Sequence, residues 1–594
     1  MVLLKQITMS FLVLVFFGLG ILFASDEPEP NWFENTTNHF SYDLALPSLY
    51  EAANATAQSI DRTGARSGII AHHLLVGDKI AQTISALGNG REKTVVIISP
   101  NHFNLGRSVM QTTDGTWKTP FGDVEVDVDV LEELLGTEGQ GGSAPDLWYE
   151  PETFKQEHGI SAIVPFVKVW FPRARIVPIV VHDDATSQQL VDLARSIQSA
   201  APRAVVLASI DMSHNLPAHI QTVHDEMTMR TIENGNCADT SCNLEIDSNA
   251  ALETLFTINA LRETQAWHLM HHGSSLAMGA TDDWWENTSH ILGYFERGKP
   301  IDEPFLSIQF VGDVMLDRGV RSKMELQDVE YPWKEVQRYL QGAHLRVANL
   351  EGTISEEASM ATEEPPFRFT FAPEFVEALK PFIDVVSLAN NHSRDRDLEG
   401  EAVTQQWLDT LEIDWFGGYA TAEPVYRTGR VSIVGYHQFG TSLDEVEAVI
   451  QQEELAGQFV IVFPHWGVEY VSVPQDGQRE LAKRMIQTGA DLIIGSHPHV
   501  IQGIEMIESV PIIYSLGNFV FDQVEPGTDM GMSATVLLDD LGGTIYLSPV
   551  ATINGQPTPL SDDQAHLIFQ NIASLSSENL ESRILTGIIP FSYD

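Results

Sequence analysis

The sequence predicts an α/β protein built from two domains in succession. The chain has 594 residues, enough for two or more domains that each bury a full core. Two long stretches alternate short apolar runs, typical of strands, with longer amphipathic runs. Between them lies ERGKPIDEP (296–304), which combines charges, a glycine and two prolines. We therefore expect one domain over 46–298, a linker over 299–304 and a second domain over 305–594.

The first 25 residues predict export or membrane anchoring. Lys5 is the only charge before FLVLVFFGLGILFA (11–24), and acidic, proline-containing sequence follows at once. The apolar run is short for a membrane span but approaches the required length when its flanks are included. LFA (22–24) is an imperfect cleavage site, so a cleaved signal and a retained anchor both stay open. We therefore expect a signal peptide or membrane anchor over 1–25, a linker over 26–45, and an extracytoplasmic location for the rest of the chain.

Composition restricts the partners of the folded body. With 43% apolar and 9% aromatic residues the chain is globular. It carries 82 acidic and 34 basic residues, a formal charge of −48. Nucleic acid and anionic membrane surfaces need basic patches, so we expect no nucleic-acid partner and membrane contact only through the N-terminus. The acidity indicates either a well-hydrated surface suited to salt or a surface that captures cations.

The two cysteines lie close together, in NCADTSCN. Cys237 and Cys242 could close a small disulfide loop, which fits an oxidising compartment. A reduced pair that binds a metal is the alternative.

Apolar runs in the first domain predict strands. They are TVVIISP (94–100), ARIVPIVV (174–181) and RAVVLASID (203–211). Their alternation with longer amphipathic segments is typical of an α/β domain.

Side chains that bind metals follow the strand-like runs of the second domain. They are Asp313 after LSIQFVG, Glu351 after LRVANL, Asn391 and His392 after FIDVVSLAN, His465 after QFVIVFP, and His497 and His499 after DLIIGS. The carboxyl ends of parallel strands meet at one edge of a sheet, so we expect these side chains to lie together. In GSHPHV (495–500), an extended backbone would point His497 and His499 the same way, because residues i and i+2 of a strand share a face. Carboxylate, amide and imidazole groups suit Mn, Fe or Zn, with one or two ions bound.

The second domain resembles the CapA family of poly-γ-glutamate capsule-synthesis proteins, which is similar to calcineurin-like metallophosphoesterases. The motifs are GDVMLDR, VANLEG, SLANNHSRD, FPHWGVEY, GSHPHVIQG and YSLGNFVFDQ, in order over about 305–525. The resemblance implies an α/β sandwich, and it also implies a role for each of the site residues. Asp313 and His499 would hold the first metal, Glu351 would bridge, and Asn391, His465 and His497 would hold the second. His392 would act as an acid or electrostatic stabiliser, so that it and Asp313 are the candidate catalytic residues.

One departure affects the first metal. A phosphoesterase usually has a histidine where this chain has Met315, and a thioether is a poor ligand for a hard divalent ion. We therefore expect the first site to be weak, empty or completed by another residue.

The first domain resembles the Memo family, known in bacteria as the AmmeMemoRadiSam system protein B, whose fold is similar to class III extradiol dioxygenases. The motifs are SGIIAHHLLVG, IISPNHF, TPFGDVEVD, QEHGISAIVPFV and SIDMSHN, over about 67–296. Mapping the family's histidines gives His73, His102 and His214 as ligands of a possible single metal. The pair Glu157-His158 and Asp211 match other polar motif positions.

This resemblance also has departures. The family's APHAG reads AHHLL here, and its Cys-Gly motif reads EIDSNAA, where Asp247 would replace a thiolate ligand. His268, His271 and His272 would line the pocket or lie on the surface. The domain either binds a metal or is a degenerate fold that docks a partner.

Two functions follow. The first is an exported or anchored hydrolase whose C-terminal centre acts on a phosphoester or an envelope polymer. The second is a non-catalytic protein that tethers an anionic polymer through metal during capsule assembly, alongside the capsule-synthesis machinery. No GxSxG motif appears, so a covalent serine hydrolase is not expected. Fold resemblance alone does not decide between the two.

Overall fold

The computed structural model describes residues 38–40, 47–135, 143–144, 146–237, 242–357, 359–361, 367–418 and 424–592. The predicted export or anchor segment (1–25) lies outside them, as does the predicted linker 26–45 apart from β1. Strand β1 (Asn38–Phe40) pairs in parallel with β5 (Thr116–Lys118). In the described ranges, no helix combines the length and apolar character needed to cross a membrane.

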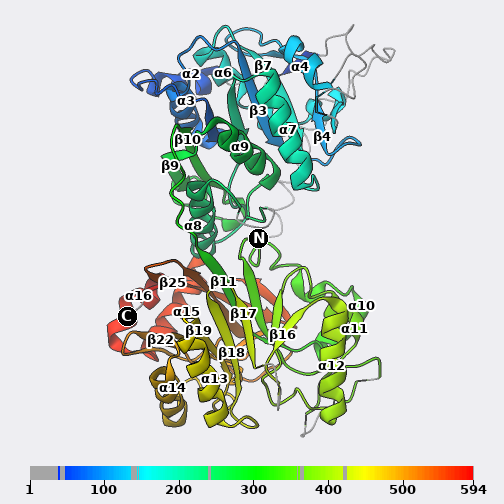
Figure 1. Cartoon of the computed structure of the whole chain (residues 1–594), viewed down its shortest axis with the longest axis vertical. Coiled ribbons are helices and arrows are strands. Elements are labelled where there is room, and N and C mark those ends of the chain that lie inside the picture. The colour runs from blue at the N-terminus through cyan, green and yellow to red at the C-terminus, as the bar shows by residue number, and fades with distance from the viewer. Residues whose placement is uncertain are drawn as a thin grey trace, which may run out of the picture.

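The chain folds into two α/β halves, stacked along the long axis of the molecule (Figure 1). The last strand of the first half ends at Glu296, and the first strand of the second half begins at Leu306. The connecting residues are bonded to helix α8 (Ala218–Asn234). The Ile301 N–H donates to the Glu233 carbonyl at 3.1 Å, and the Asn234 side chain donates to the Glu303 carbonyl at 2.9 Å.

The N-terminal half contains an eight-stranded sheet in the order β6-β4-β7-β3-β8-β2-β10-β9. Their bounds are β2 (Ser67–Ile70), β3 (Thr94–Pro100), β4 (Met110–Thr112), β6 (Leu147–Tyr149), β7 (Arg175–Val181), β8 (Val205–Ser209), β9 (Ala266–Ser274) and β10 (Ser289–Glu296). The central strands β7, β3, β8 and β2 are parallel, and their residues are almost all buried; β3, β7 and β8 lie in the apolar runs that predict strands.

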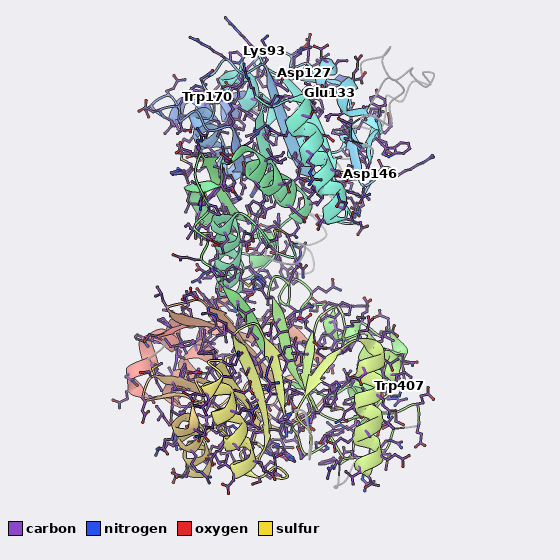
Figure 2. The ribbon with its side chains drawn as sticks, in the orientation of Figure 1. Lys93, Asp127, Glu133, Asp146, Trp170 and Trp407 are labelled. Atoms are coloured by element: carbon purple, nitrogen blue, oxygen red, sulfur yellow. A yellow bond between two sulfur atoms is a disulfide. The ribbon has the colours of Figure 1, made fainter. Side chains whose placement is uncertain are left out.

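Helices cover both faces of this sheet. They are α2 (Pro47–Thr56), α3 (Gly77–Ala86), α4 (Val128–Leu135), α5 (His158–Ser161), α6 (Val164–Trp170), α7 (Ser187–Ala200), α8 and α9 (Asn249–Arg262). Helix α3 packs with α2 and α6, and α9 packs with α7, giving a three-layer arrangement around one core. Trp170, on α6, donates from its indole N–H to Asn54 on α2 at 2.7 Å (Figure 2).

The C-terminal half contains two sheets. The first has nine strands, β11 (Leu306–Val314), β12 (Leu345–Leu350), β15 (Val385–Ser387), β16 (Asp414–Phe416), β23 (Asn518–Val520), β24 (Met530–Leu538), β25 (Gly542–Ile553), β26 (Gln556–Pro559) and β27 (Ile588–Ser592). The second has six, β17 (Val425–Thr428), β18 (Val431–His437), β19 (Phe459–His465), β20 (Leu492–Ile494), β21 (Ile504–Ile507) and β22 (Val510–Ile513). Strands β13 (Thr353–Ile354) and β14 (Thr370–Phe371) form a separate pair.

The two sheets face each other across a shared apolar core, which confirms the predicted sandwich. Phe310 of the first sheet and Phe463 of the second have ring centroids 5.5 Å apart in this core. Helices pack on the outer faces, with Trp407 of α12 against the first sheet (Figure 2). The helices of this half are α10 (Arg318–Leu326), α11 (Pro373–Glu377), α12 (Asp397–Leu411), α13 (Leu443–Leu455), α14 (Asp476–Thr488), α15 (Asp562–Ser574) and α16 (Glu581–Thr586).

Helix α8 joins the two halves. Asp562 of the C-terminal half accepts hydrogen bonds from the Ala218 and His219 N–H groups, both at 3.0 Å, at the first turn of α8. Near the other end, Arg230 donates to Asp539 at 3.1 Å. Ile220, also on α8, belongs to the apolar core beneath β11 and β12. The interface therefore combines a helix cap, an ion pair and apolar packing.

The two cysteines are joined in a disulfide, as the first of the two sequence interpretations predicts. The bond lies just after α8, on the wall of a cavity between the halves.

Candidate metal centres

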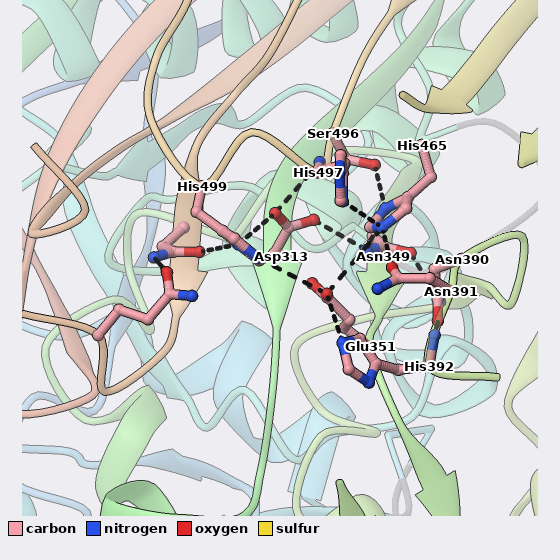
Figure 3. A network of polar contacts seen from close by, with 12 residues as sticks. Asp313, Asn349, Glu351, Asn390, Asn391, His392, His465, Ser496, His497 and His499 are labelled. Carbon is pink, nitrogen blue, oxygen red and sulfur yellow. Dashed lines mark hydrogen bonds and ion pairs between the residues drawn. The ribbon is translucent and has the colours of Figure 1, made fainter. Parts of the chain in front are cut away.

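The C-terminal strand ends bring the predicted side chains to one place (Figure 3). Asp313 lies near the end of β11, Glu351 directly follows β12, and His465 is the last residue of β19. Strands β11 and β12 are parallel, with Asp313 in register with Asn349, so their carboxyl ends are adjacent. Two overlapping groups each hold three ligand atoms within 4.8 Å of one another: Asp313, Glu351 and His499, and Glu469, His497 and His499.

Glu351 lies at the centre of this cluster. Its carboxylate is fully buried, and neither oxygen has a hydrogen-bond partner in the described chain. Three imidazole nitrogens surround its Oε1: Nε2 of His392 at 3.7 Å, of His499 at 3.8 Å and of His465 at 4.0 Å. Burial raises the pKa of Glu351 to about 7, because the charged form loses hydration. An uncompensated buried carboxylate among imidazoles fits a bound cation, so the residues present suit a divalent metal.

Asp313 and His499 form the second part of the cluster. Asn349 donates to one oxygen of Asp313 at 2.8 Å, and His499 Nδ1 lies 3.2 Å from the other. Burial opposes protonation of His499, but the carboxylates of Glu351 and Asp313 outweigh it and raise its pKa to about 9. The positive charge on His499 offsets the two acids only in part, because the pKa of Glu351 stays above its ordinary value. A metal would replace that proton.

His465, His497 and Asn391 form the third part. His465 Nε2 lies 2.6 Å from Asn391 Oδ1 and 3.0 Å from His497 Nδ1. Burial holds the pKa of both histidines well below the ordinary value, so both imidazoles are neutral and available as ligands.

The GSHPHV segment reaches the cluster by a route that differs from the prediction. His497 has φ of +97° and His499 of +60°, so neither residue is extended. The prediction of a straight strand was therefore wrong. The chain turns at both positions, and the His497 N–H approaches an oxygen of Asp313 at 3.3 Å. The two rings still converge, with centroids 6.0 Å apart.

His392 lies beside the cluster, oriented by a carboxylate. Its Nδ1 is 2.8 Å from Asp395, and its Nε2 faces Glu351. Although burial lowers the pKa of His392, the Asp395 hydrogen bond and the charge of Glu351 outweigh it and raise the pKa. A histidine held in this way can donate a proton at Nε2.

Met315 is fully buried in the apolar core beneath β11 and β12. Its sulfur accepts a hydrogen bond from the Asp317 N–H at 3.0 Å. Glu469 is the side chain that sequence reasoning missed. It is exposed, lies in FPHWGVEY shortly after His465, and gathers with His497 and His499. Its position within a motif that already supplied a ligand was the available signal.

A cavity of about 530 Å³ opens onto this cluster. His392 and His499 of the cluster line it, together with the exposed Glu469 and with Arg318. The Arg318 guanidinium carbon lies 5.0 Å from the Phe369 ring centroid and 5.5 Å from that of Phe521, and the group pairs with Asp522. The cavity thus presents a fixed cation opposite the ligand cluster.

The N-terminal half gathers a second cluster at the carboxyl edge of its sheet. His72 follows β2, His102 follows β3 and Asp211 follows β8. Two further groups hold ligand atoms within 4.8 Å: His72, His102 and His158, and His72, Asp211 and Asp247. Asp247 lies just before Ser248, which caps α9 by accepting from the Ala251 N–H at 3.1 Å.

Carboxylates pair with two of the imidazoles in this cluster. Asp247 lies 3.1 Å from His72 Nε2 and 3.5 Å from His102 Nε2, while His102 Nδ1 lies 2.7 Å from Glu157. Burial alone would lower the pKa of His102, but Asp247 and Glu157 raise it to about 10. Burial lowers the pKa of His158 to about 4, which leaves that imidazole neutral. Three imidazoles and two carboxylates are a donor set that suits Mn, Fe or Zn.

The structure places two of the four predicted N-terminal residues elsewhere. His102 and Asp247 lie in the cluster. His73 instead faces His290, with Nδ1 2.9 Å from Nε2, and its neighbour His72 takes the place. Successive side chains of an extended segment point to opposite sides, so a shift by one residue exchanges them. His214 belongs to neither group and lines an adjacent cavity of about 540 Å³.

The histidines of WHLMHHGSS lie on β9, the edge strand of the sheet. His268 pairs with Glu296 at 3.1 Å and His272 with Asp225 at 2.9 Å. They belong to neither ligand group.

Comparison with known proteins matches each half separately. Residues 307–523 match the family described as bacterial capsule synthesis protein PGA_cap, and residues 50–281 match the family described as Memo-like protein. The PGA biosynthesis protein CapA of Bacillus subtilis (strain 168) is 27% identical over 290 residues, 45% of this chain and 76% of the relative. The capsule biosynthesis protein CapA of Bacillus anthracis is 28% identical over 286 residues, 43% of this chain and 70% of the relative. A MEMO1 family protein of Methanopyrus kandleri is 30% identical over 252 residues, 39% of this chain and 83% of the relative.

Proposed function

Because this chain belongs to the MEMO1 family through its N-terminal half and joins to it a capsule-synthesis half of the CapA type, we propose that it is an exported or membrane-anchored capsule or exopolymer biosynthesis protein. Its C-terminal centre would act as a metal-dependent hydrolase on a phosphoester or an envelope polymer of the poly-γ-glutamate type. Two relatives carry names in capsule and PGA biosynthesis, which supports the process.

The observation that carries the proposal is the state of Glu351. A carboxylate that is fully buried, accepts no hydrogen bond in the described chain and faces three imidazole nitrogens is costly unless a cation binds there. Asp313, Glu351 and His499 would hold one ion, and Asn391, His465 and His497, with Glu469, a second. A bound Mn, Fe or Zn ion would supply Lewis-acid chemistry.

Residues around the cluster provide the remaining steps of hydrolysis. Arg318 would bind the anionic part of the substrate in the cavity through its guanidinium. His392, oriented by Asp395, would donate a proton from Nε2 to the leaving oxygen. The cavity walls would hold the bond to be cleaved between these two groups.

A tethering function is the second candidate. Glu469 and Glu525 are exposed acids that line the cavity mouth. An anionic polymer would approach this mouth only with bridging cations, which favours metal-assisted binding without cleavage.

Metal content and hydrolysis, measured on the full chain, test the proposal. Elemental analysis would compare the wild type with His497→Ala, and we expect a loss of bound transition metal in the variant. A phosphoester and polymer hydrolysis screen would then compare the wild type with His392→Ala. Loss of a general acid typically lowers kcat by about 100-fold or more, and metal content should stay unchanged.

The exposed His566 provides the matched control, His566→Ala, which should behave as the wild type. Absence of metal from folded wild-type protein after reloading would refute the metal centre. Retained metal and polymer binding, with no hydrolysis that depends on His392, would establish the tether instead.

A further inference from the structure

The cavity of about 540 Å³ beside the N-terminal cluster is built from both halves of the chain. Its floor contains His102 and Asp247 of the cluster, together with Glu245. Another part of its wall is formed by Gln337, Arg338 and Gln341, which belong to the C-terminal half.

Contacts between the two halves fix this wall. Arg338 Nη1 donates to Glu245 Oε1 at 2.6 Å, and the Glu245 side chain is only 2% exposed. Gln341 donates from its side chain to the Leu244 carbonyl at 2.9 Å. The backbone approaches closely at Gly342, where an added Cβ would lie 3.2 Å from the Met227 side chain on α8.

The wall is tied to the cluster through one short loop. Glu245 accepts from the His214 N–H at 3.1 Å, and Asp247, shortly after it, accepts from the Asp211 N–H at 3.1 Å. Arg338 therefore reaches the loop that positions a candidate metal ligand.

Among the described residues that line this cavity, Arg338 is the only lysine or arginine. The carboxylates there have partners: Asp247 faces His72 and His102, Glu245 faces Arg338, and Asp183 accepts from the Ala250 N–H at 3.4 Å. Within the described chain, Arg338 Nε and Nη2 have no hydrogen-bond partner, and the side chain is 52% exposed. A guanidinium with one edge used and the other free binds carboxylate or phosphate oxygens.

We propose that this cavity is a composite site for a small anionic ligand, a carboxylate or a phosphate, and that Arg338 of the C-terminal half is its specificity-determining residue. The ligand's anionic group lies against the free edge of Arg338, and the rest of the ligand extends toward His102 and Asp247. The N-terminal site is incomplete without the C-terminal half.

A titration with two probe anions tests the site. Inorganic phosphate and malonate are titrated separately into the full chain, with and without Co²⁺, following the heat of binding and the visible absorption of Co²⁺. All proteins carry His465→Ala and His497→Ala, which removes ligands of the C-terminal centre, so the result is independent of the proposed hydrolase function. The variants are Arg338→Met, Arg338→Lys and, as a matched control, Arg430→Met, whose arginine forms an exposed ion pair with Asp540.

We expect at least one probe to bind, with its Kd raised about tenfold or more by Arg338→Met. Arg338→Lys should recover part of the affinity, because lysine keeps the positive charge but lacks the paired N–H donors of a guanidinium. Arg430→Met should leave the Kd unchanged. Should Arg338→Met fail to fold because it leaves Glu245 unpaired, the double variant Arg338→Met with Glu245→Gln replaces it. The proposal is overturned if neither anion binds the protein that carries only the two histidine changes. It is also overturned if both anions bind Arg338→Met as tightly as they bind that protein.

Discussion

At the scale of single residues, Glu351 is completely buried, and its carboxylate has no hydrogen-bond partner in the described chain. Glu351→Gln removes the buried charge and keeps the shape of the side chain. Above pH about 7, where Glu351 is ionised, we expect the metal-free variant to gain about 1–3 kcal/mol in the free energy of unfolding, because a buried carboxylate that the imidazoles compensate only in part costs more than a neutral amide. Urea unfolding in EDTA measures this gain, and elemental analysis should show that bound metal is lost.

Glu325→Gln is the control for that experiment, because Glu325 is half exposed on α10. It should change neither stability nor metal content appreciably. An unchanged or lower stability of Glu351→Gln without metal, at a pH where Glu351 is ionised, would contradict the assignment of Glu351 as an incompletely compensated buried charge.

Residue-level prediction from sequence succeeded where the strand end alone fixes the position. Asp313, Glu351 and His465 sit on or beside regular strands, so the alternation of apolar runs located them. It failed where the backbone leaves the strand. His497 and His499 adopt positive φ, a conformation that costs about 1–2 kcal/mol per residue and that no local pattern specifies. The exchange of His73 for His72 has the same origin, because side-chain direction depends on where the strand ends.

At the scale of elements, α8 receives its N-terminal cap from the other half of the chain. Pro217 precedes the helix and provides no side-chain cap, and Asp562 supplies the missing acceptor. We expect Asp562→Ala to lower the free energy of unfolding by about 1–2 kcal/mol. Thermal or urea unfolding measures the loss, and the neighbouring Asp563→Ala, at an exposed position, should be near neutral. Equal effects of the two variants would show that the cap is unimportant.

His224, also on α8, predicts how stability depends on pH. It is 2% exposed, neither ring nitrogen has a hydrogen-bond partner in the described chain, and burial lowers its pKa from 6.5 to about 4. Between these values the unfolded chain binds a proton that the folded chain does not. Stability should therefore fall as pH decreases from about 6.5 to about 4, by up to ~3 kcal/mol from this residue.

The measurement is the difference between wild type and His224→Met in urea unfolding across that pH range. The variant cannot take up the proton, so its curve should be flatter. His566→Met, at an exposed position, should keep the wild-type slope. Parallel curves for wild type and His224→Met would contradict a buried neutral histidine.

Elements were more predictable than their packing. The runs quoted for β3, β7, β8, β12 and β20 contain the observed strands, and the run quoted for β19 covers all but its last residue, because continuous apolar runs specify buried strands. The role of α8 was not predicted. Its contacts with Asp562 and Asp539 join residues more than 300 positions apart, and nothing local in either segment indicates the other.

At the scale of the whole molecule, the charge of −48 predicts that salt stabilises the fold. Repulsion among surface carboxylates is screened as the Debye length shrinks. We expect the melting temperature to rise by several degrees between about 0.05 and 0.5 M NaCl. Calorimetry in EDTA measures the shift, and KCl at equal ionic strength should reproduce it. A melting temperature that falls or stays constant would show that the acids are already compensated.

The shared wall at Arg338 has a consequence for the history of such a chain. Glu245 is buried in the N-terminal half, but the cation that pairs with it, Arg338, belongs to the C-terminal half. Helix α8 of the N-terminal half likewise takes its cap from Asp562 of the C-terminal half. A gene rearrangement that separated the halves would leave a buried acid without its counter-ion and a helix without its cap. We therefore expect this chain to tolerate the exchange of one half alone poorly, because each exchange would remove a partner group that the retained half needs.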